Sequence, residues 1–246
     1  AEGRPITVGL IGAGKFGSMF LASAQRMTGL QVAGIADLAL PRARDGLARI
    51  GWPAAQYGAA SLDAALAGGG TFLTEDAAAL IADPRIEVIV ECTGHPAAGI
   101  RHALAAIGHG KHIVMVNVEA DVLAGPLLAA RAKAAGVVYS MAYGDQPALV
   151  CEIVDTLRTE GFTVIAAGKG TKYLPEYHAS TPATVWGHYG LSEEQARVGG
   201  MNPQMFNSFL DGTKSGIEMA AIANATGLAP PEDGLAFPPC GVQDLP

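Results

Sequence analysis

Short, nearly continuous apolar segments alternate with longer, alanine-rich segments along roughly the first 145 residues of the chain. The apolar segments cover residues 6–12, 31–37, 87–94, 112–118 and 136–144. Strands that are buried on both faces have this continuous apolar character. Segments of helical length, each ending in or near glycine, lie between them at 17–27, 40–51, 95–110 and 119–136. This repeated strand–helix order predicts a parallel, doubly wound sheet of the α/β class.

The pattern is less regular in two other regions. Residues 52–86 suggest a helix, a glycine-rich loop, a short strand and a second helix. After the last apolar segment, the sequence predicts a helix at 147–160, a strand at 162–170, a long polar and aromatic loop at 171–203, and a helix that includes 207–218. We therefore expect two domains, 1–150 with the parallel sheet and 151–246 with a smaller α+β fold for substrate and subunit contacts. Because the chain begins without Met and ends in a proline-rich stretch, we expect it to be part of a longer polypeptide.

Composition and charge exclude several classes of protein. Half of the 246 residues are apolar, 16% are charged and the net charge is −7, so the chain can fill a core but offers no basic surface for nucleic acid or anionic lipid. Its three cysteines form no CxxC pair, which favours a reducing compartment over a disulfide framework or a zinc site. No apolar segment is long enough to cross a membrane and no signal-peptide pattern opens the chain, so we expect a cytoplasmic protein. Its expected partners are a small-molecule substrate and further copies of the chain, as a homodimer or homotetramer.

A glycine motif follows the first expected strand. Gly12, Gly14 and Gly17 form GxGxxG between a strand and a helix, and Asp37 ends the next strand. The first glycine permits a tight turn, the second lets a pyrophosphate approach the backbone, and the third lets helix and strand pack closely. Strand, helix and spaced acid together predict a Rossmann-type dinucleotide site rather than a plain turn.

The choice between NAD and NADP depends on the residues that follow. Asp37 favours NAD, since a carboxylate accepts hydrogen bonds from ribose hydroxyls and repels a 2′-phosphate. Arg42 and Arg44 follow closely and could neutralise that carboxylate, so NADP stays open.

Further cofactor contacts are expected where the later strands end, because ligands lie across the carboxyl ends of the strands in an open α/β sheet. Thr93 and Gly94 follow one strand, while Asn117 and Glu119 follow the next. The alternative for Glu119, and for Asp121 beside it, is helix capping and interaction with the helix dipole. We interpret Cys92 as a small buried hydrophobe and not as a nucleophile. The expected cofactor-binding residues are Gly12, Gly14, Lys15, Phe16, Gly17, Asp37, Thr93, Gly94, Asn117 and Glu119.

The stretch 166–180 is unusually rich in ionisable groups for a protein so poor in charge. Lys169 and Lys172 lie beside glycines whose backbone amides could join them in binding a substrate phosphate or carboxylate. The alternative is an ordinary solvated loop.

Residues 207–218 carry their charges at helical spacing. Asn207, Asp211, Lys214 and Glu218 would share one face of a helix, within an arc of about 60°. The other faces are small or apolar, so we expect a helix packed on most sides with this polar stripe turned into a cleft; a simple row of salt bridges is the alternative.

Such a stripe suits hydride-transfer chemistry. Hydride arriving at a carbonyl carbon leaves an alkoxide, which needs a proton or a nearby cation. Lys214 fits that task, with Asp211 orienting it and Asn207 as a neutral hydrogen-bonding neighbour. The candidate catalytic residues are Lys214, Asp211, Lys169, Lys172, Glu218 and Asn207, and no ligand spacing identifies a metal site, although a divalent metal stays possible.

Several motifs resemble a known family. "VGLIGAGKFG", "GIAD", "ECTG" and "HIVMVNVEAD" resemble the nucleotide domain of homoserine dehydrogenases, and "FLDGTKSGIEMAAIANATGL" resembles their Asp-and-Lys catalytic segment. "AAGKGTKYLPEYHASTP", "GGMNPQMFNSFLDGTKS" and "FPPCGVQDLP" are similar to a branch of homoserine dehydrogenase-like oxidoreductases that often carries a SAF-type region and includes 1-deoxy-D-xylulose 5-phosphate reductoisomerase-like enzymes. The resemblance implies an NAD(P)-dependent reductase with Lys214 and Asp211 in its catalytic cleft.

One departure from the family bears on the substrate. Homoserine dehydrogenases usually carry an Asn-Lys pair where this chain has Val118 and Glu119, so homoserine is not the expected substrate. We expect hydride transfer to a small, anionic or phosphorylated hydroxy-carbonyl compound. The alternatives are a reductoisomerase-like enzyme of isoprenoid precursor synthesis and a non-catalytic dinucleotide-sensing protein.

Overall fold

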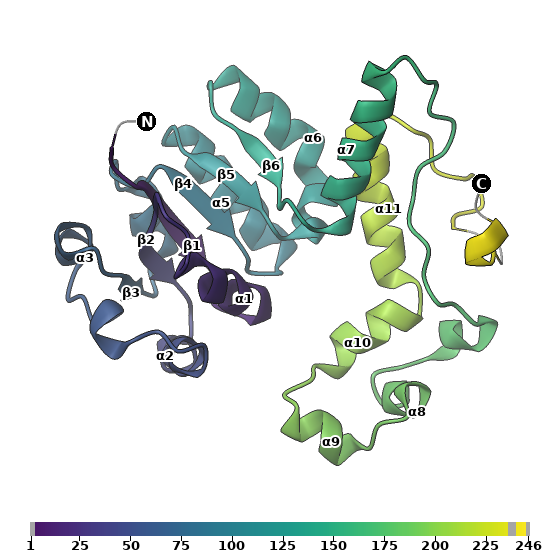
Figure 1. Ribbon diagram of the computed structural model, residues 1–246, viewed down its shortest axis with the longest axis horizontal. Coiled ribbons are helices and arrows are strands. Elements are labelled where there is room, and N and C mark those ends of the chain that lie inside the picture. Colours follow the sequence, from purple (N-terminus) through teal and green to yellow (C-terminus); the bar gives the residue numbers. More distant parts are fainter. Residues whose placement is uncertain (1–2, 236–239, 245–246) are drawn as a thin grey trace. The chain divides into compact units, whose positions relative to one another are not determined.

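The computed structural model describes residues 3–235 and 240–244 of the chain. Part of the proline-rich stretch 237–246 therefore lies outside the described residues. The chain divides into two compact units, residues 1–145 and 146–246 (Figure 1). No helix among the described residues is long and apolar enough to cross a membrane.

The first unit contains a six-stranded sheet in the order β3-β2-β1-β4-β5-β6, and every neighbouring pair is parallel. This confirms the doubly wound parallel sheet. The strands are β1 (Ile6–Ile11), β2 (Leu30–Ala36), β3 (Phe72–Thr74), β4 (Val88–Glu91), β5 (His112–Met115) and β6 (Tyr139–Met141). The order reverses between β1 and β4, and ligands of such folds bind beyond the carboxyl ends of the strands at that point.

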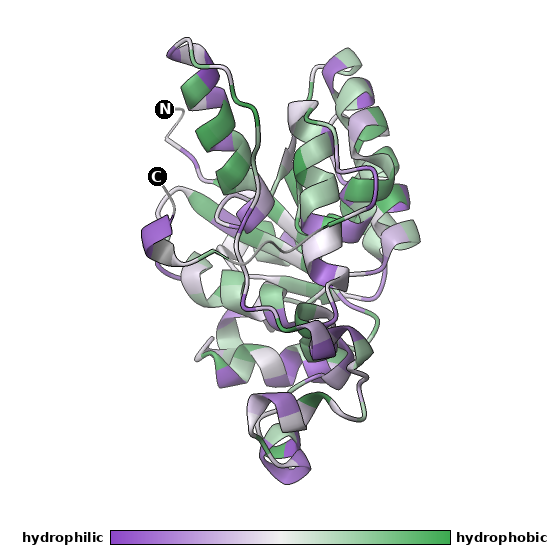
Figure 2. Ribbon diagram, turned by 90° about the vertical axis from the view of Figure 1, so that its right-hand side faces the viewer, coloured by the Kyte–Doolittle hydropathy of each residue, from purple (hydrophilic) through white to green (hydrophobic). Residues whose placement is uncertain are grey.

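Helices cover both faces of this sheet. They are α1 (Lys15–Ala24), α2 (Leu40–Arg49), η1 (Ala54–Gln56), α3 (Leu62–Gly68), α4 (Ala77–Ala82), α5 (Pro96–Gly108) and α6 (Val118–Ala134). Successive strand residues point to opposite faces. Ile11 and Ile89 join a buried cluster with residues of α4, α5 and α6, whereas Leu10 and Val90 join a cluster with residues of α1 and α2. Figure 2 shows the hydrophobic and hydrophilic residues that alternate along the helices.

Two expected strands are shorter than the apolar pattern suggested. The segment 112–118 leaves the sheet after Met115, because Asn117 caps α6 by accepting a hydrogen bond from the backbone N–H of Ala120. The segment 136–144 contributes only Tyr139–Met141 to the sheet. Residues 52–86 contain the predicted helix, glycine loop, short strand and second helix.

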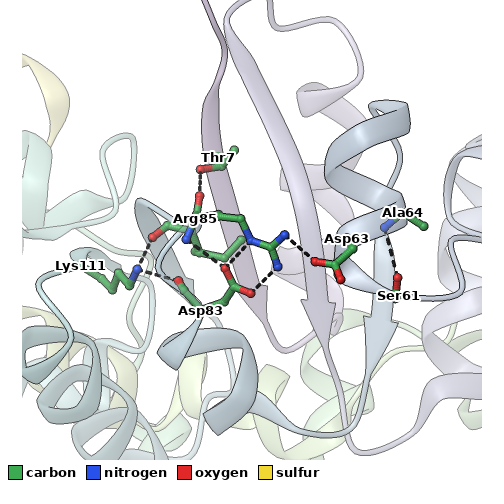
Figure 3. Close-up of polar contacts among 8 residues, drawn as sticks. Thr7, Ser61, Asp63, Ala64, Asp83, Arg85 and Lys111 are labelled. Atoms are coloured by element: carbon green, nitrogen blue, oxygen red, sulfur yellow. Dashed lines mark hydrogen bonds and ion pairs between the residues drawn. The ribbon is translucent and has the colours of Figure 1, made fainter.

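Charged side chains form ion pairs and hydrogen bonds near the amino ends of the strands (Figure 3). Arg85, just before β4, forms ion pairs with Asp83 and Asp63. Lys111, just before β5, is buried and donates to the backbone oxygens of Asp83 and Ile86 at 2.7 and 2.6 Å. Burial lowers the pKa of Lys111, while the charge of Asp83 acts in the opposite direction. This edge of the sheet is therefore held by ion pairs and by the hydrogen bonds of Lys111.

The second unit is helical. Its elements are α7 (Gln146–Thr159), η2 (Pro175–Ala179), α8 (Val185–Tyr189), α9 (Glu193–Val198), α10 (Pro203–Leu210), α11 (Thr213–Thr226) and η3 (Val242–Asp244). α11 packs against α7 and α10, and a small buried cluster forms around Tyr177, Trp186 and Leu210.

Two predictions for this unit are wrong. The described residues of the unit include no strand, so the segment 162–170 and the α+β class are not observed. A β-prone run needs a neighbouring strand to satisfy its backbone groups, and this unit offers helices instead. The segment 171–203 is not one long loop, because it contains η2, α8 and α9; Ser192 and Gln195 form a capping box that begins α9.

The predicted helix through 207–218 is two helices. α10 ends at Leu210 and α11 begins at Thr213. Gly212 between them has a φ of +88°, a left-handed conformation that glycine adopts without strain. Asp211 closes the break, since its Oδ1 accepts a hydrogen bond from the backbone N–H of Thr213 at 2.9 Å. The four polar residues therefore do not form a stripe on one continuous helix.

Candidate functional site: the glycine turn and the carboxyl ends of the strands

The three glycines after β1 differ in what surrounds them. Gly12 has a φ of +95°, and a Cβ there would lie 2.8 Å from the backbone oxygen of Cys92. A Cβ on Gly17 would collide with the backbone oxygen of Gly12. A Cβ on Gly14 would meet no atom within 4 Å. The first and third glycines thus serve packing, while Gly14 faces the open space that a pyrophosphate needs.

The start of α1 carries no competing side chain. Its N-cap residue, Gly14, makes no side-chain cap, and its first turn holds no acidic residue. By contrast, side chains of Ser61, Asp76, His95 and Asn117 cap α3, α4, α5 and α6. The backbone amides and the positive end of the dipole at α1 therefore suit an anion.

Asp37 links this turn to the end of β2. Its Oδ2 accepts a hydrogen bond from the backbone N–H of Ala13 at 2.8 Å, and its Oδ1 accepts one from Ala39 at 2.8 Å. The guanidinium of Arg42 lies 3.6 Å from Oδ1. Asp37 is only 9% exposed, and its carboxylate both supports the glycine turn and lies beside Arg42 at the pocket wall.

A pocket of about 500 Å³ lies along this edge. Four of the predicted cofactor residues line it: Gly12, Gly14, Asp37 and Thr93. Its walls also include residues that we did not single out from the sequence, namely Leu38, Glu75, Ala77, His95, Ala98, Arg101 and His102.

The other predicted cofactor residues do not line this pocket. Gly17 serves the packing of α1, and Gly94 adopts a φ of +65°. Asn117 is buried as the cap of α6, and Glu119 lies in the first turn of that helix. Lys15 and Phe16 lie in the first turn of α1, where Phe16 is 40% exposed.

A buried polar network joins the ends of β4 and β5. Oε1 of Glu91 accepts a hydrogen bond from the hydroxyl of Thr93 at 2.6 Å, and it lies 3.1 Å from Nδ1 of His102. The side-chain amide of Asn117 donates to the Thr93 hydroxyl at 3.4 Å. Glu91 is completely buried. The sequence did carry a signal for it, because an acid inside the apolar segment "EVIVECTG" interrupts a strand that is otherwise apolar.

Burial raises the pKa of three other ionisable groups in this region. Burial raises the pKa of Asp121, while the hydroxyl of Tyr139 opposes that shift by donating to Oδ1 at 2.8 Å. Burial also raises the pKa of Tyr139 and of the Cys92 thiol. Cys92 is therefore a protonated thiol at neutral pH and not a nucleophile.

The second unit brings two pairs of predicted catalytic residues together. The side-chain amide of Asn207 donates to Oδ2 of Asp211 at 2.9 Å, and Asn207 accepts a hydrogen bond from the hydroxyl of Ser180 at 2.7 Å. Lys169 and Glu218 form an ion pair, and Glu218 is 3% exposed. Glu218 lacks a well-aligned hydrogen bond at Oε2, so the contact with Lys169 is one of charge.

The three predicted lysines differ in their surroundings. Lys214 is half-buried in the first turn of α11, and Lys172 is exposed. Lys169 forms its ion pair with the buried carboxylate of Glu218, and its predicted role in binding a substrate anion stays a prediction. Within residues 3–235 and 240–244, no three His, Cys, Asp or Glu side chains are grouped to hold a metal ion.

Comparison with known proteins relates both units to oxidoreductases. Residues 8–141 match the family model "Homoserine dehydrogenase, NAD binding domain", and residues 144–246 match "Oxidoreductase DRL, catalytic domain". No curated protein matches the chain.

One solved structure shows the same fold, and two others match part of the chain. A homoserine dehydrogenase from Thiobacillus denitrificans is 21% identical, with 92% of this chain and 50% of that chain covered and a TM-score of 0.58. An NAD binding oxidoreductase from Klebsiella pneumoniae is 20% identical over 64% of this chain and 39% of that one, with a TM-score of 0.44. Levoglucosan dehydrogenase in complex with NADH is 23% identical over 64% and 40%, also with a TM-score of 0.44. The chain thus spans half or less of the length of these three structures. The family model "Homoserine dehydrogenase, NAD binding domain" matches more than half of the residues of the chain. The chain therefore belongs to the family of homoserine dehydrogenase NAD-binding domains.

Proposed function

We propose that the chain is an NAD(P)-dependent oxidoreductase that transfers hydride to the carbonyl group of a small, anionic hydroxy-carbonyl substrate. The observation that carries this proposal is the open Gly14 position at an uncapped helix start, beside a buried acid that holds the turn. The match of the second unit to an oxidoreductase catalytic domain supports it.

The described residues fit a dinucleotide. The backbone amides at Gly14 would hold the pyrophosphate, and Asp37 would accept hydrogen bonds from the adenosine ribose hydroxyls. The carboxylate disfavours a 2′-phosphate, but Arg42, 3.6 Å away, offsets part of that repulsion. We therefore propose NAD as the preferred cofactor and NADP as a weaker one.

The residues of the second unit supply the proton chemistry in this proposal. When bound, the cofactor gives or accepts the hydride. Lys214 stabilises the alkoxide that forms and donates a proton to its oxygen. Asp211, fixed by Asn207 and by the N–H of Thr213, orients the substrate beside that lysine.

The anionic end of the substrate is assigned to Lys172, which is exposed on the segment after Gly170. Lys169 instead fastens this segment to α11 through Glu218. A phosphorylated ketose would suit Lys172, so a reductoisomerase-like reaction is the second candidate. That reaction commonly uses a divalent metal, and the described residues hold no cluster of His, Cys, Asp or Glu that would bind one.

We also propose that the protein is cytoplasmic and that copies of the chain assemble into a homo-oligomer.

The test is oxidation of NADH and NADPH by the protein in the presence of homoserine-pathway aldehydes and phosphorylated ketoses. Lys214→Ala should lower kcat by a factor of about 100 or more while leaving NADH affinity unchanged, because it removes a proton donor and not a cofactor contact. Lys133→Ala, which removes an exposed lysine of α6, is the matched control. An unchanged rate in Lys214→Ala would contradict the chemistry assigned to that lysine. A wild-type protein that binds NADH but oxidises it with none of these substrates would favour a non-catalytic dinucleotide-sensing protein.

A further inference from the structure

Glu91 ends β4 as a fully buried carboxylate with one unpaired oxygen. Oε1 serves Thr93 and His102, whereas Oε2 has no hydrogen-bond partner among the described residues. An unpaired buried carboxylate oxygen costs stability. Fold stability alone therefore does not account for an acid at this position, which contacts two residues that line the pocket, Thr93 and His102.

The bond to Glu91 fixes how His102 presents its ring. As a carboxylate, Glu91 has no hydrogen to give at Oε1, which already accepts the hydrogen bond from Thr93. Nδ1 of His102 must then be the donor, and Nε2 points away from Glu91. His102 lines the pocket and its side chain is 21% exposed, so the Nε2 edge is the part of the ring that a ligand can reach.

The backbone of α5 is adapted to this contact. A Cβ on Gly99 would lie 2.7 Å from the side-chain nitrogen of Asn117 and 3.2 Å from Oε2 of Glu91. Glycine at this position lets α5 lie close to the end of β4, and His102 follows it by less than one turn. His95, which caps α5, lines the same pocket.

The position of His102 within the pocket indicates which part of a dinucleotide it meets. The pocket includes Asp37 and Leu38 from the end of β2, and Glu75 and Ala77 from the region after β3. These strands lie on the β2–β3 side of the glycine turn, where the adenosine ribose and base are expected. The same pocket also includes Thr93 after β4 and His102 of α5, so His102 borders a pocket that reaches from the end of β4 to the expected adenosine site.

We propose that Nε2 of His102 contacts the adenosine half of the dinucleotide and that Glu91 is a positioning residue for His102. The inference rests on the proposed cofactor function and extends it to a residue pair that is separate from the glycine motif. Its ligand is the adenine nucleotide moiety, which AMP represents in isolation.

Two substitutions of similar size, His102→Asn and His102→Gln, distinguish the role of Nδ1 from the role of Nε2. His102→Asn places an amide near the former Nδ1 and keeps the donor to Glu91, but it removes the nitrogen that faces the pocket. His102→Gln extends an amide towards the former Nε2 and loses the donor to Glu91. A purely structural histidine would tolerate Asn better than Gln in both stability and binding.

The experiment measures NADH affinity by fluorescence titration, with AMP and nicotinamide mononucleotide as competing ligands. His102→Asn should weaken NADH and AMP by the same factor, about tenfold, which corresponds to one hydrogen bond, and should leave nicotinamide mononucleotide and the melting temperature unchanged. His102→Gln should melt at a lower temperature and bind AMP more tightly than His102→Asn. Wild-type affinity for AMP in His102→Asn, or a loss confined to the mononucleotide, would overturn the proposal.

Glu91→Gln tests the positioning role by proton NMR. The hydrogen on Nδ1 should give a downfield resonance in the wild-type protein that disappears in His102→Asn and moves upfield in Glu91→Gln, because a neutral amide oxygen is a weaker acceptor. A resonance that Glu91→Gln leaves in place would overturn that role.

If the wild-type protein bound neither NADH nor AMP, the proposed cofactor function itself would fail. If the wild-type protein bound both and His102→Asn bound them equally well, only the inference about His102 would be overturned.

Discussion

The carboxylate of Asp37 accepts a hydrogen bond from the backbone N–H of Ala13 at 2.8 Å, so the acid that ends β2 also holds the glycine turn that follows β1. The same carboxylate bonds the backbone N–H of Ala39 and lies near Arg42. We therefore expect a substitution of Asp37 to affect the support of the turn and, in the proposed function, the choice of cofactor as well.

Asp37→Asn should weaken NADH binding by about tenfold and raise the affinity for NADPH relative to NADH. The amide keeps one acceptor oxygen, so one of the two backbone N–H groups loses its partner, while the repulsion of a 2′-phosphate disappears and Arg42 remains. Fluorescence titration with both cofactors measures this. Asp45→Asn, at an exposed position of α2, should change neither affinity. An unaltered ratio of the two affinities in Asp37→Asn would contradict the assignment of Asp37 to the ribose.

Gly14→Val and Gly17→Ala should differ in their effects on NADH binding and on thermal stability. A Cβ at Gly14 would have no protein atom within 4 Å, so the variant should keep its melting temperature but lose NADH binding by steric exclusion of the pyrophosphate. A Cβ at Gly17 meets the backbone oxygen of Gly12, so that variant should lose stability as well. Thermal melting and NADH titration on both variants separate these effects. Normal NADH affinity in Gly14→Val would rule out the proposed pyrophosphate position.

Lys169→Met should destabilise the protein by about 2–3 kcal/mol, because it leaves the carboxylate of Glu218 buried without its cation. The double variant Lys169→Met with Glu218→Leu should recover most of that loss, since no buried charge then remains. Urea unfolding monitored by circular dichroism gives the free energies. Lys172→Met, at an exposed lysine of the same segment, should be neutral. A loss in Lys169→Met that the second substitution does not repair would show that the ion pair is not its cause.

Stability should fall as the pH drops from about 4.5 towards about 2, in part through Glu87. The guanidinium of Arg4 and the backbone N–H of Thr7 lower the pKa of Glu87 from 4.5 to about 2. The folded protein thus binds this proton less readily than the unfolded chain does, so the contribution is complete above pH 4.5 and is lost as the pH falls through the folded value. Glu87→Gln should flatten this part of the melting-temperature profile, and Glu160→Gln, at an exposed site, should not. Parallel profiles for wild type and Glu87→Gln would refute the linkage.

The sequence was sufficient for the sheet and for the glycine turn because their signals are local. Continuous apolar strands need burial on both faces, and Gly12, Gly14 and Gly17 stand at a spacing that the turn itself requires. The positive φ at Gly12 and the close packing at Gly17 agree with the turn and packing roles predicted for them, while the role of Gly14 stays a prediction. The position of Asp37 at the end of β2 followed from the same pattern.

The sequence was insufficient where the outcome depends on distant partners or on one backbone angle. The apolar run 162–170 has β propensity, but the helical unit gives it no strand to pair with. Helical spacing through 207–218 conceals the positive φ of Gly212, which splits the helix. Glu91 was visible as an acid in an apolar strand, but its contact with His102 depends on how closely α5 packs against β4.

The two outermost strands of the sheet, β3 and β6, are each three residues long. An edge strand exposes unpaired backbone N–H and C=O groups that can recruit a strand from another molecule. Short edges leave few such groups for an intruding strand, so a sheet whose interior strands are strongly apolar is protected from growing into an aggregate. Substitutions that lengthen β3 or β6 would therefore endanger the protein's solubility before they altered its chemistry.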